Sequence, residues 1–477
     1  MHFIQLEYLV VFLPIVVGLY YVFRTTPVAN VVIMLASYYF YGSSGLFYLV
    51  PLLFTSVLDF VVGQRIERTD HKRARFALLM ASVVANLGLL FFFKYATWVI
   101  TSTNQLFSLM GLSIILPVVI VPLPPGISFY TFQTMSYTIE VYRREMKASH
   151  NIVNYMAFVT FWPHLVAGPI MRAHNLLAQL ERIRPIVTAN EFRYAILLIG
   201  WGLAKKLVLA DNFGQIVDSI DSQAHGASIW SGAGLLYAYA FAGQIYCDFS
   251  AYTTIARGSA KLIGVELPRN FLTPYLSQSP SEFWRRWHIS LSTWLRDYLY
   301  ITLGGNRHGR VREYSNLMIT MVLGGIWHGA GILFLLWGAW HGLLLILYRL
   351  FPLDQKLTQW FGFVGRLLAI VLMFHLVCFG WLLFRADLNT FTPLLSSIGA
   401  LLHGETHPYF FLYGRGVLAL GLVTLATDWL GYRRQGEFED VFERYGFLRS
   451  ALTIVVCYFA VTLLGKREGA QFIYFQF

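Results

Sequence analysis

The stretch LMITMVLGGIWHGAGILFLLWGAWHGLLLILY covers residues 317–348 and contains no Lys, Arg, Asp or Glu. A helix that crosses the hydrocarbon core of a membrane needs about 20 predominantly apolar residues, so this stretch predicts two consecutive spans. His328 and His341 interrupt the apolar run. An ionisable side chain at membrane depth is costly, and it therefore raises a functional hypothesis.

The composition extends this interpretation to the whole chain. Of the 477 residues, 57% are apolar and 13% are charged, whereas soluble domains average roughly half and roughly a quarter. This balance excludes a soluble, fibrous or disordered protein. We predict an all-α fold, a polytopic transmembrane helical bundle of about 11 to 13 crossings with additional re-entrant or interfacial helices. We expect a single membrane domain over residues 1–477, because no linker divides the chain.

The distribution of positive charge predicts the orientation. The formal net charge is +11, and the densest basic loop lies between Arg65 and Arg75. Short loops rich in Lys and Arg stay in the cytosol, so the preceding apolar segment ends there and the N-terminus lies on the opposite side of the membrane. A basic surplus of this kind faces anionic lipid headgroups, and it implies no nucleic-acid partner.

Residues 248–314 interrupt the hydropathy pattern while staying rich in aromatic side chains. Ser279 followed by Pro280 is typical of a helix N-terminus, and we predict a helix over residues 280–300. One face of this helix is aromatic and includes His288, whereas the rest carries basic side chains. The pattern favours an interfacial or re-entrant segment, which is followed by the histidine-bearing helices of 316–351.

Five charged side chains in this region have two interpretations each. Arg285, Arg286 and Arg307 either anchor the segment to lipid headgroups or hold the phosphates of a nucleotide-bearing acyl donor. Asp248 and Asp297 either fix the tautomer of an imidazole or belong to structural ion pairs. The sequence leaves both interpretations open.

His328 is the main candidate for chemistry. Glycines surround it, and they leave room for another helix or an acyl chain to approach closely. The alternative is a buried histidine that holds two helices together, which is the interpretation that we favour for His341. Because the sequence contains no HExxH motif and no Cys/His cluster, we expect no metal site.

A resemblance to a known family is carried by two stretches, FWRRWHISLSTWLRDYLYITLGGNR (283–307) and LGGIWHGAGILFLLWGAWHG (323–342). They closely resemble the signature of the membrane-bound O-acyltransferase family, in particular its bacterial alginate O-acetyltransferase-like branch. The similarity extends over nearly the whole chain, for example in PPGISFYTFQTMSYTIEVYR (124–143), FWPHLVAGPIMR (161–172) and QIYCDFSAY (244–252). The sequence departs from the pattern of this branch at Ala251, Thr254 and Thr302, where Gly, Asp and Pro are usual.

The resemblance implies a helical bundle around a central tunnel in the bacterial inner membrane. In that membrane, the N-terminus predicted from the basic loop is periplasmic. The resemblance also implies acetyl-CoA as a donor substrate from the cytosol and no bound cofactor. The core histidine of the family corresponds to His328, which we expect to act as the general base. The second polar position of the family corresponds to His288, which we expect to orient the thioester or to stabilise the oxyanion.

The expected function is transfer of acetyl groups from cytosolic acetyl-CoA across the membrane to an extracytoplasmic polysaccharide of the alginate or cellulose type. Resemblance to related systems implies a periplasmic SGNH-type or related partner and a polysaccharide synthase or export complex, besides membrane lipid. The alternatives are D-alanyl or peptidoglycan acyl transfer by the same fold, and a non-catalytic scaffold for polymer export.

Tyr474 lies within the segment QFIYFQF (471–477) and has two interpretations. Its ring is either an anchor at the membrane interface or part of a covalent relay. The relay follows from a resemblance to the aromatic terminal motif of small partners of D-alanine exporters, in which the phenol is expected to carry the acyl group.

Overall fold

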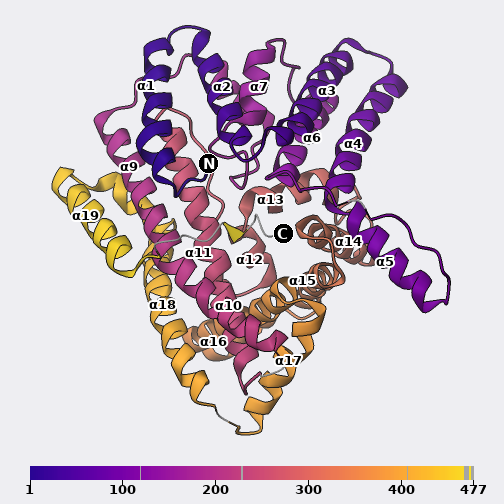
Figure 1. Ribbon diagram of the computed structural model, residues 1–477, viewed down its shortest axis with the longest axis vertical. Helices are drawn as coiled ribbons and strands as arrows, with labels where there is room; N and C mark the ends of the chain where they lie inside the picture. The colour runs from indigo at the N-terminus through magenta and orange to yellow at the C-terminus, as the bar shows by residue number, and fades with distance from the viewer. Residues whose placement is uncertain (119, 227–228, 406, 467–471, 474–477) are drawn as a thin grey trace. The chain divides into compact units, whose positions relative to one another are not determined.

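The computed structural model describes residues 1–477 except 119, 227–228, 406, 467–471 and 474–477 (Figure 1). The described chain is built from helices and contains no strand. It divides into two compact units, Met1–Ala195 with Ala256–Pro268, and Ile196–Ile255 with Arg269–Phe477. The prediction of an all-α fold is therefore confirmed for the described residues.

Among the described residues, the first unit contains eight complete α-helices, the beginning of a ninth, and the end of α11 (Ala233–Lys261). The first nine are α1 (Leu13–Phe23), α2 (Val28–Gly42), α3 (Leu49–Arg68), α4 (Lys72–Lys94), α5 (Ala96–Leu109), α6 (Ile127–Arg143), α7 (Ile152–Thr160), α8 (Ala173–Leu180) and the first part of α9 (Ala189–Ala204).

The second unit contains the end of α9 and most of the remaining helices. They are α10 (Asp211–His225), α11 (Ala233–Lys261, up to residue 255), α12 (Pro280–Arg286), α13 (Ile289–Trp294), α14 (Arg310–His328), α15 (Ile332–Leu350), α16 (Leu353–Arg385), α17 (Leu388–Leu402), α18 (Pro408–Arg433) and α19 (Phe447–Leu464).

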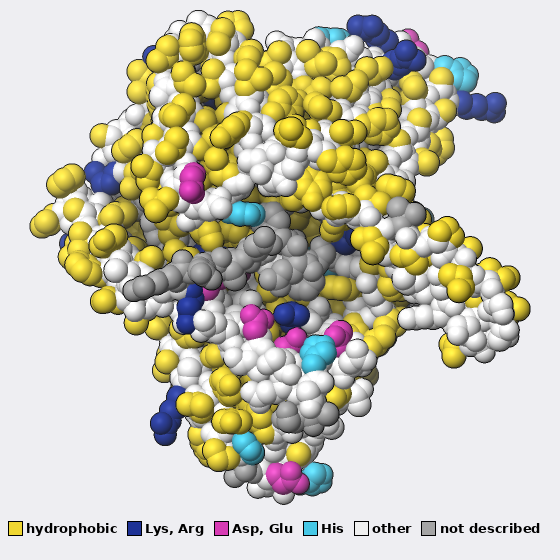
Figure 2. All heavy atoms as spheres, viewed as in Figure 1, with side chains coloured by type: hydrophobic (Ala, Val, Ile, Leu, Met, Phe, Trp, Pro, Cys, Tyr) yellow, Lys and Arg dark blue, Asp and Glu magenta, His cyan; other side chains and the backbone are white. Residues whose placement is uncertain are grey.

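Within the described part of the chain, six helical segments are long and apolar enough to cross a membrane. They are Leu46–Arg68, Lys72–Lys94, Ile332–Leu350, Leu353–Arg385, Pro408–Arg433 and Phe447–Leu464. Figure 2 shows hydrophobic side chains over much of the visible surface, as expected for helices that face lipid. The protein is thus a multi-pass membrane protein, while the count of 11 to 13 crossings and the central tunnel stay predictions.

Buried polar side chains join the helices of the first unit. The Asp59 carboxylate on α3 accepts hydrogen bonds from Ser82 Oγ (2.6 Å) and Asn86 Nδ2 (2.8 Å) on α4. A Cβ atom at Gly63 would lie only 2.6 Å from the Tyr137 ring, so glycine allows α3 to approach α6. The predicted basic loop lies where α3 ends and α4 begins, and Figure 2 shows Lys and Arg side chains gathered there. The cytosolic placement of this loop stays a prediction.

The predicted helix over residues 280–300 is wrong in one respect, because it is broken at His288. Its start is confirmed, since Ser279 Oγ accepts the backbone N–H of Glu282 and Pro280 is the first helical residue. α12 then ends at Arg286, and His288 takes a left-handed conformation with φ of 41°. After α13 the chain continues as a π-helical turn over Leu295–Tyr300.

The break has a tertiary cause. The backbone oxygen of Asn270 accepts the N–H of Ile289 (2.9 Å), and the side-chain oxygen of Asn270 accepts the N–H of Ser290 (3.1 Å). These two donors are therefore satisfied by a distant loop, as the first N–H groups of a new helix must be. Left-handed φ costs a residue with a side chain about 1–3 kcal/mol, and the surrounding packing holds His288 in this conformation.

Two glycines let α14 and α15 pack with their backbones in contact. A Cβ atom at Gly325 would lie 2.3 Å from the backbone oxygen of Phe334, and one at Gly338 would lie 2.4 Å from that of Met321. The prediction that glycines near His328 admit another helix is confirmed. The close packing fixes the end of α14, which carries His328, against the side of α15, which carries His341.

Candidate functional site

His328 is the last residue of α14, and its imidazole lies among three aromatic rings. The ring centroid of His328 is 4.8 Å from that of Trp327, 5.1 Å from Trp337 and 5.2 Å from Phe384. His328 keeps 6% of its surface exposed. His328 is thus a buried residue whose imidazole is enclosed mainly by apolar rings.

His288 approaches the same cluster from the break between α12 and α13. Its ring is fully buried, stands edge-on to Phe249 of α11 at 4.7 Å, and lies 6.2 Å from Trp327. Since Trp327 also contacts His328, one indole lies against both predicted histidines. The structure thus brings together two residues that are 40 positions apart in the sequence.

His341 belongs to this cluster as well, although the sequence favoured a purely structural role. Its ring is 4.8 Å from Trp337, the indole that also contacts His328, and it stacks on Phe283 at 5.9 Å. Its position was signalled by the repeated tripeptide WHG, which occurs at 327–329 and again at 340–342. Each occurrence places a histidine beside a tryptophan on adjoining helices.

Asp248 lies in a buried ion cluster. The sequence identified Asp248 but not its partner Lys206 or the second carboxylate, Asp211. The Lys206 ammonium group is 2.7 Å from a carboxylate oxygen of Asp248 and 2.7 Å from one of Asp211, and all three side chains are buried. The second carboxylate oxygen of Asp248 accepts the backbone N–H of Ile473 at 2.6 Å. These contacts agree with the structural interpretation of Asp248. The signal for Lys206 was a pair of lysines inside the apolar segment GLAKKLVLADN (202–212).

The other charged candidates lie in different surroundings. Arg286 pairs with Glu282 at 2.8 Å and donates to Thr273 Oγ1 at 3.0 Å. Asp297 pairs with its neighbour Arg296 at 2.7 Å. Arg285 and Arg307 are exposed. The exposure of these two arginines is compatible with either predicted role, headgroup or phosphate binding, and both stay predictions.

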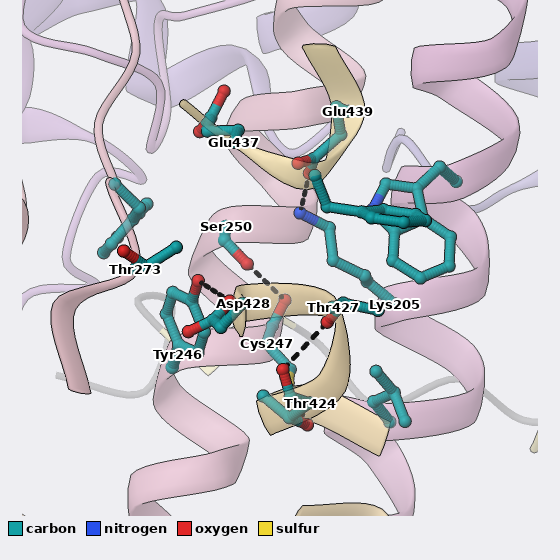
Figure 3. Close-up of a pocket in the computed structure, with 14 residues that line it drawn as sticks. Lys205, Tyr246, Cys247, Ser250, Thr273, Thr424, Thr427, Asp428, Glu437 and Glu439 are labelled. Atoms are coloured by element: carbon teal, nitrogen blue, oxygen red, sulfur yellow. Dashed lines mark hydrogen bonds and ion pairs between the residues drawn. The ribbon is translucent and has the colours of Figure 1, made fainter. Parts of the chain in front are cut away.

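A small polar hollow of about 20 Å³ lies one aromatic layer from His288, and Figure 3 shows residues that line it. Lys205 pairs with Glu439 on one side of it, and Tyr246 donates to Asp428 at 2.7 Å on the other. The lining residue Phe271 contacts Phe249, the ring that stands against His288. The hollow is therefore polar inside and separated from the histidine cluster by aromatic rings.

Two further predictions concern Tyr474 and metal ions. Tyr474 lies outside the described residues, but Phe472 and Ile473 just before it are 2% and 1% exposed. Within the described part of the chain, no group of three or more His, Cys, Asp and Glu side chains is placed to hold a metal ion.

The arrangement suits proton transfer in apolar surroundings. A neutral imidazole accepts a proton on one nitrogen and donates from the other, and the aromatic rings around His328 exclude most water. Hydrogen bonds and charges act strongly in such a low-dielectric site. The cluster therefore offers a base and several ring N–H groups around a reacting group.

Comparison with known proteins identifies relatives of this chain. Residues 87–379 match the model of the membrane-bound O-acyltransferase family. The chain is 39% identical over 383 residues to a probable alginate O-acetylase of Pseudomonas aeruginosa, covering 80% of this chain and 71% of that protein. It is 31% identical to a peptidoglycan O-acetyltransferase of Helicobacter pylori, covering 74% of this chain and 70% of that protein.

A more distant relative is a teichoic acid D-alanyltransferase of Bacillus subtilis, which is 27% identical over 54% of this chain and 68% of that protein. The family match includes α12 to α15, and so it contains His288, His328 and His341. The chain is therefore an O-acyltransferase that belongs to the membrane-bound O-acyltransferase family.

Proposed function

We propose that this enzyme transfers acetyl groups from cytosolic acetyl-CoA across the bacterial inner membrane to hydroxyl groups of an extracytoplasmic polysaccharide of the alginate or cellulose type. The observation that carries the proposal is the buried His328 imidazole inside an aromatic cluster shared with His288. The similarity to a probable alginate O-acetylase over 80% of the chain favours acetyl transfer to a sugar hydroxyl.

In the proposed step, His328 takes the proton of the attacking hydroxyl as general base. The hydroxyl oxygen forms a bond to the carbonyl carbon of the thioester, and the carbonyl oxygen becomes an oxyanion. When the C–S bond breaks, the thiolate of CoA leaves and takes up the proton from His328. His288 orients the thioester or stabilises the oxyanion beside Trp327.

The acceptor side requires further components. We propose a periplasmic SGNH-type or related partner that completes O-acetylation, and a synthase or export complex that supplies the polymer. The loop between α3 and α4 is basic, and loops rich in positive charge resist translocation. This charge supports a cytosolic position for the loop and a periplasmic N-terminus.

Donor identity separates this proposal from the D-alanyl alternative, which the Bacillus subtilis relative represents. Inverted membrane vesicles keep the membrane-bound components and expose the cytosolic face. With radiolabelled acetyl-CoA, we expect label in the polymer fraction. With a radiolabelled D-alanyl carrier protein, we expect none. Label from the D-alanyl carrier alone would overturn the acetyl-CoA proposal.

We further propose that Tyr474 relays the acetyl group. In this relay the attacking hydroxyl of the step above is the Tyr474 phenol: its oxygen bonds to the thioester carbon, its proton goes to His328 and CoA leaves. A sugar hydroxyl then takes the acetyl group from the ester, and its proton returns to the phenol oxygen. The contacts of the preceding residues support this proposal, because the N–H of Ile473 is bound by Asp248 and the Phe472 ring lies 4.8 Å from that of Tyr252. These contacts anchor the chain inside the second unit immediately before Tyr474.

Replacing Tyr474 by Phe removes only the nucleophile. We expect polymer acetylation to fall at least about tenfold, because the covalent route is lost, while the amount of protein in the membrane stays unchanged. Acetyl content of the secreted polymer is the measurement. The matched control is Tyr458→Phe, since Tyr458 is exposed on α19. Full acetylation in Tyr474→Phe would exclude the relay.

A further inference from the structure

Three rings in contact around Trp337, which lies beside His328, carry buried nitrogen atoms without a hydrogen-bond partner among the described residues. They are Nε1 of Trp284, Nε1 of Trp337, and both Nδ1 and Nε2 of His341. Buried polar groups are nearly always hydrogen-bonded, and each unpaired group costs free energy. Four such atoms in one small region therefore need a physical explanation.

The three rings contact one another. The ring centroids are 5.8 Å apart for Trp284 and Trp337, 5.1 Å for Trp284 and His341, and 4.8 Å for Trp337 and His341. His341 is fully buried and Trp337 is 1% exposed. An indole donates only, and a neutral imidazole donates once and accepts once. The cluster therefore has three N–H donors against one acceptor, and it is matched by a group rich in acceptor lone pairs.

The proposed base His328 lies next to this cluster, and its position points to a carbonyl oxygen as the acceptor group. The His328 ring is 5.1 Å from Trp337, so a thioester carbon attacked by a hydroxyl that contacts His328 lies about one ring width from the unpaired donors. A carbonyl oxygen offers two lone pairs and becomes negatively charged as the attack proceeds. Donors fixed in an apolar site stabilise such an oxyanion strongly, because they need no reorganisation.

We propose that Trp284, Trp337 and His341 form the binding site for the carbonyl oxygen of the transferred acyl group. In this site Trp337 and His341 contact the carbonyl oxygen most directly, and His288 orients the acyl donor. This inference rests on the proposed acetyl-CoA donor, and it assigns a role to a histidine that the sequence had placed in packing.

The test compares Trp337→Phe with Trp340→Phe on the same helix. Trp340 Nε1 donates to the backbone oxygen of Leu376 at 2.9 Å, so its replacement removes a satisfied hydrogen bond. We expect Trp340→Phe to lower the unfolding temperature and to keep kcat. We expect Trp337→Phe to keep or raise the unfolding temperature, because an unpaired donor is removed, and to lower kcat about a hundredfold.

Two donor analogues test contact with the carbonyl without turnover. Acetyl-dethia-CoA keeps the carbonyl and replaces sulfur by CH₂, whereas ethyl-CoA keeps the sulfur and lacks the carbonyl. We expect the wild-type enzyme to bind the ketone at least about tenfold more tightly, since a lost buried hydrogen bond is costly. In Trp337→Phe and His341→Phe this preference should disappear.

A substitution of Trp337 by 3-benzothienylalanine exchanges the N–H for sulfur at nearly constant ring size, and it covers the case in which phenylalanine disturbs folding. Unchanged kcat and unchanged ketone preference in this variant would overturn the inference and assign the three rings to packing. If the wild-type enzyme bound neither analogue, the acetyl-CoA proposal would be wrong. The effect of the Trp337 substitution on kcat, measured with the acyl donor that the enzyme does accept, would then decide whether the ring N–H groups bind the carbonyl oxygen.

Discussion

Replacing His328 by Gln is expected to lower acetyl transfer about 10²- to 10⁴-fold, which is the usual contribution of a general base. The amount of folded protein should stay close to that of the wild type, because glutamine retains a polar side chain at a site with 6% exposure. The measurement is the acetyl content of the secreted polymer, normalised to the amount of enzyme in the membrane.

The matched control is His375→Gln on α16. His375 is exposed, and its ring contacts the Tyr239 hydroxyl at 2.7 Å, away from the aromatic cluster around His328. We expect normal acetylation in this variant. Intact acetylation with reduced polymer secretion in His328→Gln would instead support a non-catalytic export scaffold.

Replacing Lys206 by Met is expected to destabilise the protein by about 3–5 kcal/mol, the usual cost of leaving a buried charge without its partner. Lys206 lies between Asp211 and Asp248, and each of the three side chains is no more than 6% exposed. Removing the ammonium group leaves two carboxylates facing each other in apolar surroundings. Thermal unfolding of the detergent-solubilised protein measures the effect.

A compensating variant tests whether the unpaired carboxylates cause the loss of stability in Lys206→Met. Lys206→Met combined with Asp211→Asn and Asp248→Asn removes all three charges, and we expect it to recover most of the lost stability. The control Lys261→Met breaks an ion pair whose acidic partner Glu266 has 69% of its side chain exposed, so about 1 kcal/mol or less is expected. Equal unfolding temperatures for Lys206→Met and the wild type would contradict this account of the cluster.

Local patterns in the sequence predicted much of the fold. The uncharged run of 317–348 contains most of α14 and nearly all of α15, and Ser279 with Pro280 begins α12 as expected. Both features depend on interactions within a few residues, namely burial of an apolar run and capping of backbone N–H groups.

The break at His288 depends on a contact that local periodicity does not contain. Asn270 supplies oxygen atoms to the first N–H groups of α13 from 19 and 20 residues away. The helical spacing of the aromatic residues continues through the break, and therefore it predicted one helix where tertiary hydrogen bonds make two. Tertiary context overrides propensity in this way whenever a distant partner satisfies the backbone.

The candidate site was predicted in its residues more than in its arrangement. His328 was identified from its apolar, glycine-rich surroundings and, with His288, from the resemblance, but a sequence does not show that Trp327 lies against both rings. The inclusion of His341 follows from the close packing at Gly325 and Gly338, which brings α15 against α14. The Lys206 cluster joins the π-helical turn Lys205–Ala210, α10 and α11, and such long-range charge pairing leaves only a weak trace in one sequence.

The most direct test of the central claim is release of free CoA thiol by the purified enzyme in lipid nanodiscs, supplied with acetyl-CoA and an oligosaccharide acceptor. With the wild-type enzyme we expect thiol release that depends on the acceptor. With His328→Gln we expect release about 10²- to 10⁴-fold slower, although acetyl-dethia-CoA still binds with wild-type affinity. Equal acceptor-dependent release by both enzymes would contradict the assignment of His328 as the base.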